Sequence, residues 1–316
     1  MPDEPVPDLT IIIPVYNEAQ SLPELQRALR ASLEAISLAA EIIYVDDSSE
    51  DTSFEAIREI CQADARARGL QLRRHCGKSA ALTAGFDLMQ GRLVATLDAD
   101  LQDDPAELPG LLAALDQGYN MVCGWRKERA DPWSKRLASR VFNGVLAAVS
   151  GLRLHDMNTG LKVFDAQVAR EVRLYGELHR YLPLLAAQHG FRVGEVPVRH
   201  RPRRYGRSKY GGLRYLSGAL DLLTVTFLLH YRLRPLHLFS LPGLALALAG
   251  GLICAWLAWE RLFMGQFLSN RPLLTLGVLL LILGIQFFAL GLLGEALAAA
   301  HSDQWRAPVR HDTRKP

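Results

Sequence analysis

The sequence predicts an α/β protein, in which a doubly wound sheet binds a ligand at one edge and two membrane-crossing helices follow. Short β-rich runs alternate with helical stretches through the first half of the chain, as in sheets whose parallel strands are joined by crossover helices. Several of these runs end in clustered carboxylates, and ligands of such folds bind beyond the carboxyl ends of the strands. Two long apolar runs near the C-terminus predict the membrane helices. The 316 residues leave room for one full α/β domain and this smaller part.

The predicted strands are short, and two of them are almost wholly apolar, as expected for strands covered on both faces. They occupy residues 9–14, 41–46, 70–73, 93–98 and 121–124. Stretches with apolar residues at helical spacing lie between them and predict helices at 22–37, 52–67, 80–89 and 106–117.

Polar residues follow three of the predicted strands directly. The first is followed by PVYNE (14–18), the second by DDSS (46–49), and the fourth runs into LDADLQDDP (97–105). Because the carboxyl ends of parallel strands meet at one edge of a sheet, these side chains are expected to gather there. A single aspartate at such a place is often only a helix cap, which is the interpretation for Asp51 and Asp104.

The stretch LDADLQDDP crowds four aspartates into seven positions. Like charges raise one another's pKa, so this crowding indicates a counter-charge such as a metal ion. Asp98 and Asp100, with Gln102 in step along an extended segment, are predicted to face the ion. Asp103 and Asp104 are predicted instead to cap the helix that starts after Pro105.

The sequence does not match either of two familiar phosphate-binding motifs. A dinucleotide-binding turn requires G-x-G-x-x-G after the first strand, and PVYNEA contains no glycine. Gly77-Lys78-Ser79 copies the end of a P-loop, but Leu72 stands where that motif needs its first glycine. Phosphates are therefore expected to meet a metal ion and arginines.

Residues 235–259 and 272–294 contain no Asp, Glu, Lys or Arg, and each run can cross a hydrocarbon core about 30 Å thick as a helix. Two buried core helices are the alternative, which a hairpin without a polar face does not suit. Basic residues flank the hairpin at both ends, so both ends are predicted to face the cytoplasm. The start, MPDEPVPD, lacks the apolar segment of a secretory signal.

Composition excludes several other classes of protein. The four cysteines form no C-x-x-C pair, so neither a disulfide framework nor a zinc site is expected. The net charge of +3 gathers in the basic segment 199–214. Nucleic-acid binding is the rival interpretation of that segment, and the adjoining membrane hairpin argues against it.

The motifs PVYNE, VDD and DAD at successive strand ends resemble the family 2 glycosyltransferases of the GT-A fold, whose D-x-D motif holds a divalent ion on the diphosphate of a nucleotide-sugar. More narrowly, LDADLQDDP, ELHRYLP (177–183) and VRHRPRRYGRSKY (198–210) resemble the branch that loads a sugar onto a polyprenyl phosphate. That branch includes dolichol-phosphate mannose synthase and the bacterial undecaprenyl-phosphate glycosyltransferases. The resemblance covers essentially the whole chain, including the hairpin.

The resemblance implies a role for each matching residue. The nucleotide-sugar would be bound by Pro14, Tyr16, Glu18, Asp47, Asp98 and Arg126, with Asp47 reading the base. The Mg²⁺ or Mn²⁺ ligands would be Asp98, Asp100 and Gln102. The acceptor phosphate would meet Lys135, Arg203, Arg204, Ser208 and Lys209. The catalytic residues would be Asp100, Asp156, Arg203 and Lys209.

The implied domains are a cytoplasmic GT-A catalytic domain (1–212), an interfacial helix along the membrane (213–233), the membrane hairpin (234–298) and a basic cytoplasmic tail (299–316). His75 and Thr159 depart from the residues usual in the family, which leaves donor specificity open.

The expected reaction is inverting transfer of one hexose, mannose or glucose, from a GDP- or UDP-sugar to a polyprenyl phosphate. A phosphate monoester is already an anion near neutral pH, so Asp156 is either a general base or a residue that places the acceptor or Lys162. The alternatives are a polysaccharide synthase, which would normally carry Q-x-x-R-W, and a membrane-tethered nucleotide-binding scaffold without enzyme activity. A homo-oligomer remains possible by analogy alone.

Overall fold

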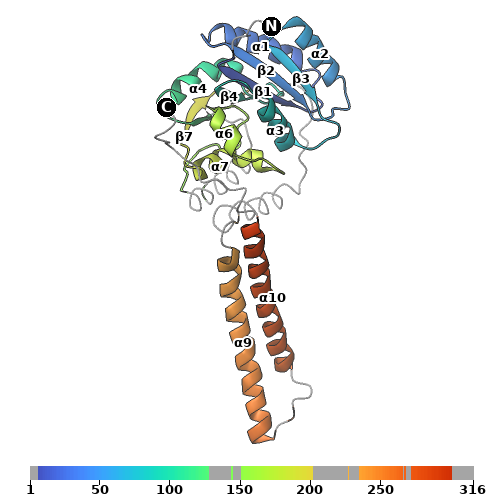
Figure 1. Ribbon diagram of the computed structural model, residues 1–316, viewed down its shortest axis with the longest axis vertical. Coiled ribbons are helices and arrows are strands. Elements are labelled where there is room, and N and C mark those ends of the chain that lie inside the picture. Colours follow the sequence, from blue (N-terminus) through green and yellow to red (C-terminus); the bar gives the residue numbers. More distant parts are fainter. Residues whose placement is uncertain are drawn as a thin grey trace. The chain divides into compact units, whose positions relative to one another are not determined.

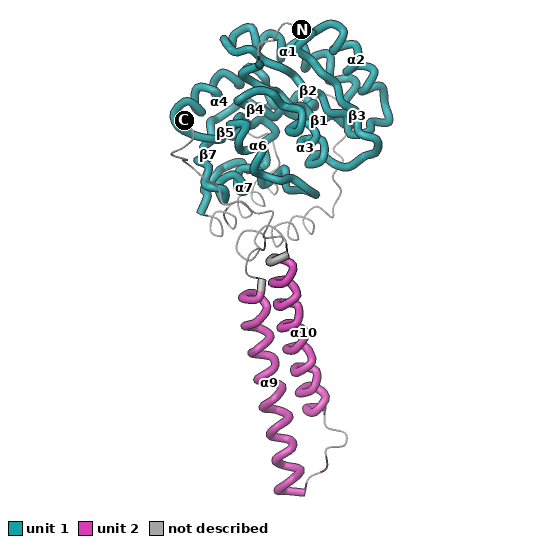
Figure 2. The backbone as a smooth tube through the Cα atoms, viewed as in Figure 1, with its two compact units in different colours: residues 1–222 teal, residues 223–316 magenta. Residues whose placement is uncertain are grey.

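The computed structural model describes residues 6–127, 144, 151–201, 227, 235–265, 267 and 272–300. The chain divides into two compact units, residues 1–222 and 223–316, coloured separately in Figure 2. The boundary falls within the range predicted for the interfacial helix, and that helix lies outside the described residues apart from position 227.

The first unit is built on a seven-stranded sheet with helices on both faces (Figure 1). Its strands are β1 (Leu9–Val15), β2 (Ala40–Asp46), β3 (Ala67–Gln71), β4 (Leu93–Thr96), β5 (Met121–Arg126), β6 (Lys162–Asp165) and β7 (Val193–Val198). Its α-helices are α1 (Leu22–Glu34), α2 (Ser53–Ala63), α3 (Lys78–Leu88), α4 (Leu108–Leu115), α6 (Ala166–Glu171) and α7 (Leu182–Gln188). Two 3-10 turns, η1 (Pro105–Glu107) and η2 (Leu178–Tyr181), complete it.

The strand order is β3-β2-β1-β4-β6-β5-β7. The chain adds β2 and β3 on one side of β1 and then places β4 on the other side. This order confirms the predicted doubly wound α/β fold and places a topological switch point beyond the carboxyl ends of β1 and β4, where such folds bind ligands. The sheet is mixed, because β6 runs antiparallel to both β4 and β5. Neither β6 nor β7 was predicted, and in β6 the four residues that begin with a lysine carry no strand pattern.

Alternating side chains of the central strands divide the core between the two faces of the sheet. Ile11 and Ile13 of β1 join the cluster that includes the apolar faces of α1, α2 and α4. Ile12 points to the opposite face of the sheet and packs against Gly85 of α3. A Cβ added at Gly85 would lie 2.5 Å from Ile12 Cγ2. Both faces of β1 are therefore buried, which is why its sequence reads as one continuous apolar run.

Predicted and observed boundaries differ mainly at helix ends. The first two helices stop at Glu34 and Ala63, short of the predicted ends, and α3 starts two residues early at Lys78. The predicted helix 106–117 is split into the turn η1 and α4. The early start of α3 matters for function, because it places Lys78 in the first helical turn at the carboxyl edge of the sheet.

The second unit is a hairpin of two long helices, α9 (Pro235–Met264) and α10 (Pro272–Ala300). Both are long and apolar enough to cross a membrane, over Leu236–Met264 and Pro272–Leu297. Glycines let the helices approach closely: a Cβ added at Gly250 would lie 2.5 Å from the carbonyl oxygen of Gly277, and one at Gly284 would lie 2.6 Å from that of Gly243. Such small-residue contacts are typical of helix pairs in membranes.

Replacing Gly250 with leucine is expected to destabilise the hairpin, because the new side chain would collide with the backbone of α10. Overpacking of this kind costs about 1–3 kcal/mol. The neighbouring Gly251 is the matched control, since its nearest neighbour across the helix pair is a leucine methyl 4.0 Å away. Thermal unfolding of both variants in the same detergent tests this prediction, and equal melting temperatures would contradict it.

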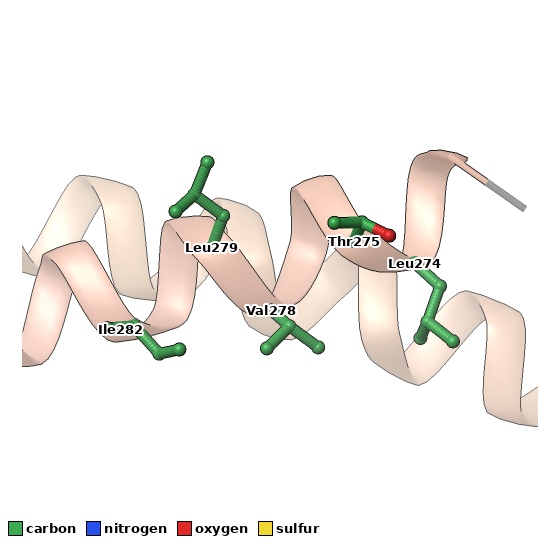
Figure 3. A pocket seen from close by; sticks show the side chains of 5 residues that line it. All are labelled: Leu274, Thr275, Val278, Leu279 and Ile282. Carbon is green, nitrogen blue, oxygen red and sulfur yellow. The ribbon is translucent and has the colours of Figure 1, made fainter.

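A shallow groove runs along α10 and is lined by Leu274, Thr275, Val278, Leu279 and Ile282, all from that one helix (Figure 3). Its lining carries no ionisable side chain. It therefore lacks the groups expected at a nucleotide-sugar site.

Candidate active site at the carboxyl edge of the sheet

Three loops form the candidate site, following β1, β2 and β4. Each contains one non-glycine residue with left-handed backbone: Asn17 (φ 56°), Ser48 (φ 60°) and Leu101 (φ 60°). Such conformations are unfavourable for residues with a Cβ and persist where surrounding contacts hold them, most often at functional sites. The same sharp bend thus occurs at each of the three strand ends that the sequence singled out.

The loops after β1 and β2 are joined by reciprocal hydrogen bonds. The amide of Asn17 donates to Ser49 Oγ at 2.9 Å, and the amide of Glu50 donates to Asn17 Oδ1 at 2.8 Å. Glu18 belongs to the same network, because its amide donates to Ser53 Oγ at 2.9 Å. The predicted nucleoside-contacting turn is therefore held against the start of α2.

Asp47 is buried, with 3% of its surface exposed, and it organises the turn before α3. Its carboxylate accepts hydrogen bonds from the amides of Cys76 at 2.7 Å and Gly77 at 2.8 Å. His75 Nδ1 lies 2.9 Å from Asp47 Oδ2, and the His75 ring stacks on Tyr16 with ring centres 4.2 Å apart. Asp47 thus holds the pair Tyr16 and His75 in place, and its predicted contact with a base stays a prediction.

Asp98, the first aspartate after β4, forms an ion pair with Lys78 at the start of α3. Both side chains are about one-third exposed, at 32%. Burial by itself would raise the pKa of Asp98, but the charges of Lys78 and Lys162 outweigh it and hold that pKa below its usual range. Lys78 was missed as a site residue because its G-K-S context was tested only as a P-loop.

The prediction that Asp98, Asp100 and Gln102 lie in step along an extended segment is wrong, because the chain turns at 99–100 and Leu101 is left-handed. The Gln102 amide donates to Asp100 Oδ1 across this bend at 3.2 Å. Among the described residues, no three His, Cys, Asp or Glu side chains form a ready-made metal site. Two carboxylates and one amide fit a hard cation such as Mg²⁺ or Mn²⁺ that takes its remaining oxygens from phosphates and water. The predicted ligand set is therefore chemically suitable.

Arg126 at the end of β5 is paired with Asp156. Its Nε lies 2.6 Å from Asp156 Oδ2 and its Nη2 lies 3.0 Å from Asp156 Oδ1, a bidentate contact. Asp156 is 2% exposed. Burial alone would lower the pKa of Arg126, but the bond to Asp156 and the charges of Asp103 and Asp98 outweigh it, so the guanidinium pKa lies above its ordinary value.

Gly160 lies directly against the carboxylate of Asp98. A Cβ added there would sit 2.5 Å from Asp98 Cγ and 2.8 Å from Asp103 Oδ2. The hydroxyl of Thr96 donates to the Gly160 carbonyl at 2.9 Å, which fixes this approach at the end of β4. The sequence analysis noted this glycine only inside DMNTGLK and gave it no role, since nothing local shows its distant neighbour.

Asp103 and Asp104, which were both predicted to cap the helix after Pro105, have different roles. Asp104 caps η1 as predicted, accepting from the Ala106 amide at 3.2 Å. The prediction that Asp103 is a helix cap is wrong: Asp103 is 3% exposed and accepts from the amide of Leu161 at 3.0 Å. Because β6 inserts beside β4, its leading residues come within reach of Asp103.

Ser79 and His179 tie the start of α3 to the segment ELHRYLP. The His179 amide donates to Ser79 Oγ at 3.2 Å, and Ser79 Oγ lies 3.0 Å from His179 Nδ1. Burial, with the nearby charges of Lys78 and Lys162, lowers the pKa of His179 from 6.5 to about 3. A neutral His179 therefore anchors the turn that presents Lys78 to Asp98.

The depressed pKa of His179 predicts a specific pH dependence. His179 becomes protonated below about pH 6.5 in the unfolded chain, but only near pH 3 in the folded chain. Stability is therefore complete above pH 6.5 and falls by about 1.4 kcal/mol per pH unit on acidification below it. His179→Asn should flatten this fall, measured as the melting temperature of the first unit between pH 7.5 and 4.5. Parallel curves for the two proteins would contradict the assignment.

All the predicted site residues that the structure describes lie in the loops and strand ends at this edge of the sheet. They are Pro14, Tyr16 and Glu18 of the β1 end, Asp47 after β2, Asp98, Asp100 and Gln102 after β4, and the pair Arg126 and Asp156. The predicted acceptor-phosphate residues Lys135, Arg203, Arg204, Ser208 and Lys209 lie outside the described residues.

Comparisons with known proteins show the family of the chain. Residues 10–172 match the family model described as "Glycosyl transferase family 2". The chain is 35% identical over 299 residues to the dodecaprenyl-phosphate galacturonate synthase of Rhizobium johnstonii, covering 93% of this chain and 88% of that protein. It is 36% identical over 297 residues to the undecaprenyl-phosphate 4-deoxy-4-formamido-L-arabinose transferase of Edwardsiella ictaluri, covering 93% and 90%.

Solved structures share the fold of the first unit at low sequence identity. Glucosyl-3-phosphoglycerate synthase from Mycobacterium tuberculosis, in complex with Mn²⁺ and UDP-glucose, matches with a TM-score of 0.54 at 15% identity, over 70% of this chain and 79% of that one. Mannosyl-3-phosphoglycerate synthase from Rubrobacter xylanophilus matches with a TM-score of 0.52 at 19% identity, over 70% and 74%. With its GT-A-like sheet and the family match over 10–172, the chain belongs to glycosyltransferase family 2.

Proposed function

We propose that this protein transfers one sugar from a nucleotide-sugar to a membrane polyprenyl phosphate. The observation that carries the proposal is the joint occurrence, in one chain, of the Asp98 and Asp100 edge of the sheet and an apolar helical hairpin. A polyprenyl phosphate keeps its tail in the bilayer, so an enzyme that uses it needs a membrane anchor. Both curated relatives carry a polyprenyl phosphate in their names and match 93% of this chain, more than its first unit of residues 1–222 alone.

The donor diphosphate would be bound by a divalent cation held by Asp98, Asp100 and Gln102. When bound, Mg²⁺ or Mn²⁺ stabilises the negative charge that develops on the leaving diphosphate. The neighbouring glucosyl-3-phosphoglycerate synthase structure, which holds Mn²⁺ and UDP-glucose, supports a cation in this role. Tyr16 and the stacked His75 provide an aromatic surface for the nucleoside at the other end of the same edge.

Cationic side chains would handle the remaining phosphate charge. Arg126 is fixed by Asp156 in a bidentate pair, so its guanidinium is already oriented before substrate arrives. Lys78 neutralises Asp98 in the free protein and is available to a phosphate once a cation takes over that carboxylate. The basic segment from Arg203 to Lys209, with Lys135, would hold the acceptor phosphate.

The acceptor needs little activation, because a phosphate monoester is already an anion near neutral pH. Its oxygen would attack the anomeric carbon from the side opposite the diphosphate and invert that centre. The anomeric configuration of the lipid product, determined by NMR, tests inversion. Retention of the donor configuration would overturn this part of the proposal.

Asp156 is expected to act by positioning Arg126 and not by accepting a proton. Asp156→Asn should lower kcat by roughly 10- to 100-fold, and adding Arg126→Ala should cause little further loss, because residues that act as a unit are not additive. The shape of the pH–rate profile should be unchanged in Asp156→Asn. Loss of its acidic limb, or full additivity of the two substitutions, would instead identify Asp156 as a general base.

We propose that both ends of the hairpin face the cytoplasm and that the catalytic unit is cytoplasmic, because basic residues flank the two apolar runs. Reporter fusions at the C-terminus and in the loop near residue 267 test this topology. Activity of a periplasmic reporter fused at the C-terminus would refute it.

The donor sugar is tested with a panel. Mannose or glucose on GDP or UDP remains the prediction, and the names of the two relatives add galacturonate and a formamido-arabinose to the sugars to be tried. The purified protein with Mn²⁺ and undecaprenyl phosphate should release nucleoside diphosphate and form a labelled lipid with one of these donors. Growth of the product into a polymer would favour a polysaccharide synthase, and nucleotide binding without any transfer would favour a scaffold.

A further inference from the structure

Residues 199–201, which begin the basic segment 199–214, lie along the loop that carries the predicted cation ligands. His200 and Asp103 pair through their backbones as an isolated antiparallel bridge. The amide of Arg201 donates to the carbonyl oxygen of Gln102 at 2.8 Å, and its guanidinium forms an ion pair with Asp104. The loop after β4 is thus held by the segment 199–201, which follows β7 in a distant part of the chain.

The side chains of Asp103 and His200 meet inside this contact. Asp103 Oδ1 and His200 Nδ1 are 3.6 Å apart, with side-chain exposures of 4% and 15%. Neither atom has a hydrogen-bond partner among the described residues, and both are buried. Asp103 Oδ2 is already used by the Leu161 amide. Since a buried polar atom without a partner is costly, the carboxylate and the imidazole each depend on the other.

We propose that Asp103 and His200 are a positioning pair that keeps the loop in the shape in which Asp100 and Gln102 can hold the divalent cation. This inference rests on the cation site of the proposed function. The loop must keep Leu101 in the left-handed region, which an L side chain adopts only under constraint. The Arg201 amide and the Asp103–His200 contact form a brace that supplies this constraint immediately after Gln102.

Arg199, in the same segment 199–201, provides a matched control. Its side chain is 87% exposed, and its Nε lies 3.9 Å from Glu107 Oε1, a contact that solvent screens. Arg199→Gln therefore changes the segment 199–201 but leaves the Arg201 amide and the Asp103–His200 contact unchanged. His200→Leu removes the imidazole nitrogens but keeps the apolar bulk, and His200→Asn returns a polar atom near the position of Nδ1.

The test measures nucleotide binding by calorimetry on the full-length protein in detergent, with UDP and GDP, each in EDTA or with Mn²⁺. In His200→Leu the gain in affinity that Mn²⁺ gives should shrink by about tenfold or more, as for other residues that support metal ligands. Affinity in EDTA should stay within about twofold of the original, since the Tyr16 and Asp47 side of the site is untouched. His200→Asn should recover most of the Mn²⁺ effect, and Arg199→Gln should retain all of it.

Equal weakening of binding with and without Mn²⁺ in His200→Leu would mean a merely structural role and overturn the inference. If His200→Leu does not fold, Asp103→Asn decides the question, because it keeps an oxygen for the Leu161 amide while altering the atom that faces His200. An unaltered protein without any Mn²⁺-dependent binding would overturn the cation site and this inference together. Normal Mn²⁺-dependent binding without sugar transfer would refute the proposed function alone.

Discussion

Asp100→Ala should reduce sugar transfer by on the order of 100- to 1000-fold, the scale on which removal of one electrostatic stabiliser of a transition state is felt. Asp100 is predicted to be a cation ligand, and no neighbouring carboxylate can replace it: Asp98 is itself assigned to the cation, and Asp103 is buried and accepts from the Leu161 amide. The variant should also lose the dependence of nucleotide binding on Mn²⁺. Initial rates and calorimetry with the same donor measure both effects.

Asp116→Asn is the control for Asp100→Ala, because it removes an equally acidic but exposed carboxylate at the end of α4. Its rate should match that of the unaltered protein. If Asp100→Ala kept its turnover and its response to Mn²⁺, the assignment of the cation to the loop after β4 would be wrong.

Gly160→Ala should lower kcat/KM by on the order of 100-fold through one added methyl group, since misplacement of a catalytic group by about 1 Å has effects of this size. The methyl group would sit 2.5 Å from Asp98 Cγ, and the Thr96 bond to the Gly160 carbonyl prevents the backbone from backing away. The carboxylate of Asp98 must therefore move out of its pair with Lys78. Steady-state kinetics with varied donor and varied Mn²⁺ measure the loss.

Gly110→Ala provides the comparison for Gly160→Ala. Gly110 lies in α4 with nothing within 4 Å of an added Cβ, so alanine should leave activity unchanged and stabilise the helix by up to about 1 kcal/mol. Equal kinetics of the two alanine variants would show that the close approach at Asp98 is not needed for catalysis.

The sequence predicted the fold class because both of its signals are local. Apolar runs such as LTIIIP mark strands buried on two faces, and the loops that follow them carry their polar residues at the same edge whatever the exact strand order. Two strands, β6 and β7, were not predicted, and β6 was missed because four residues beginning with Lys162 carry no clear period. The consequences of its insertion, including the burial of Asp103, could not be predicted either.

Periodicity, composition and motif spacing are properties of neighbouring residues, so they were enough to predict a doubly wound α/β unit, an apolar hairpin and the motifs of family 2 glycosyltransferases. Which charged side chains meet depends on the folded arrangement of the strands. Lys78 pairs with Asp98, Arg126 with Asp156, and Asp103 faces His200 across a sequence separation of nearly one hundred residues. These partners are set by strand order and by the antiparallel insertion of β6, which no local pattern specifies. The four aspartates of LDADLQDDP look alike in sequence, and their different neighbours give them different tasks.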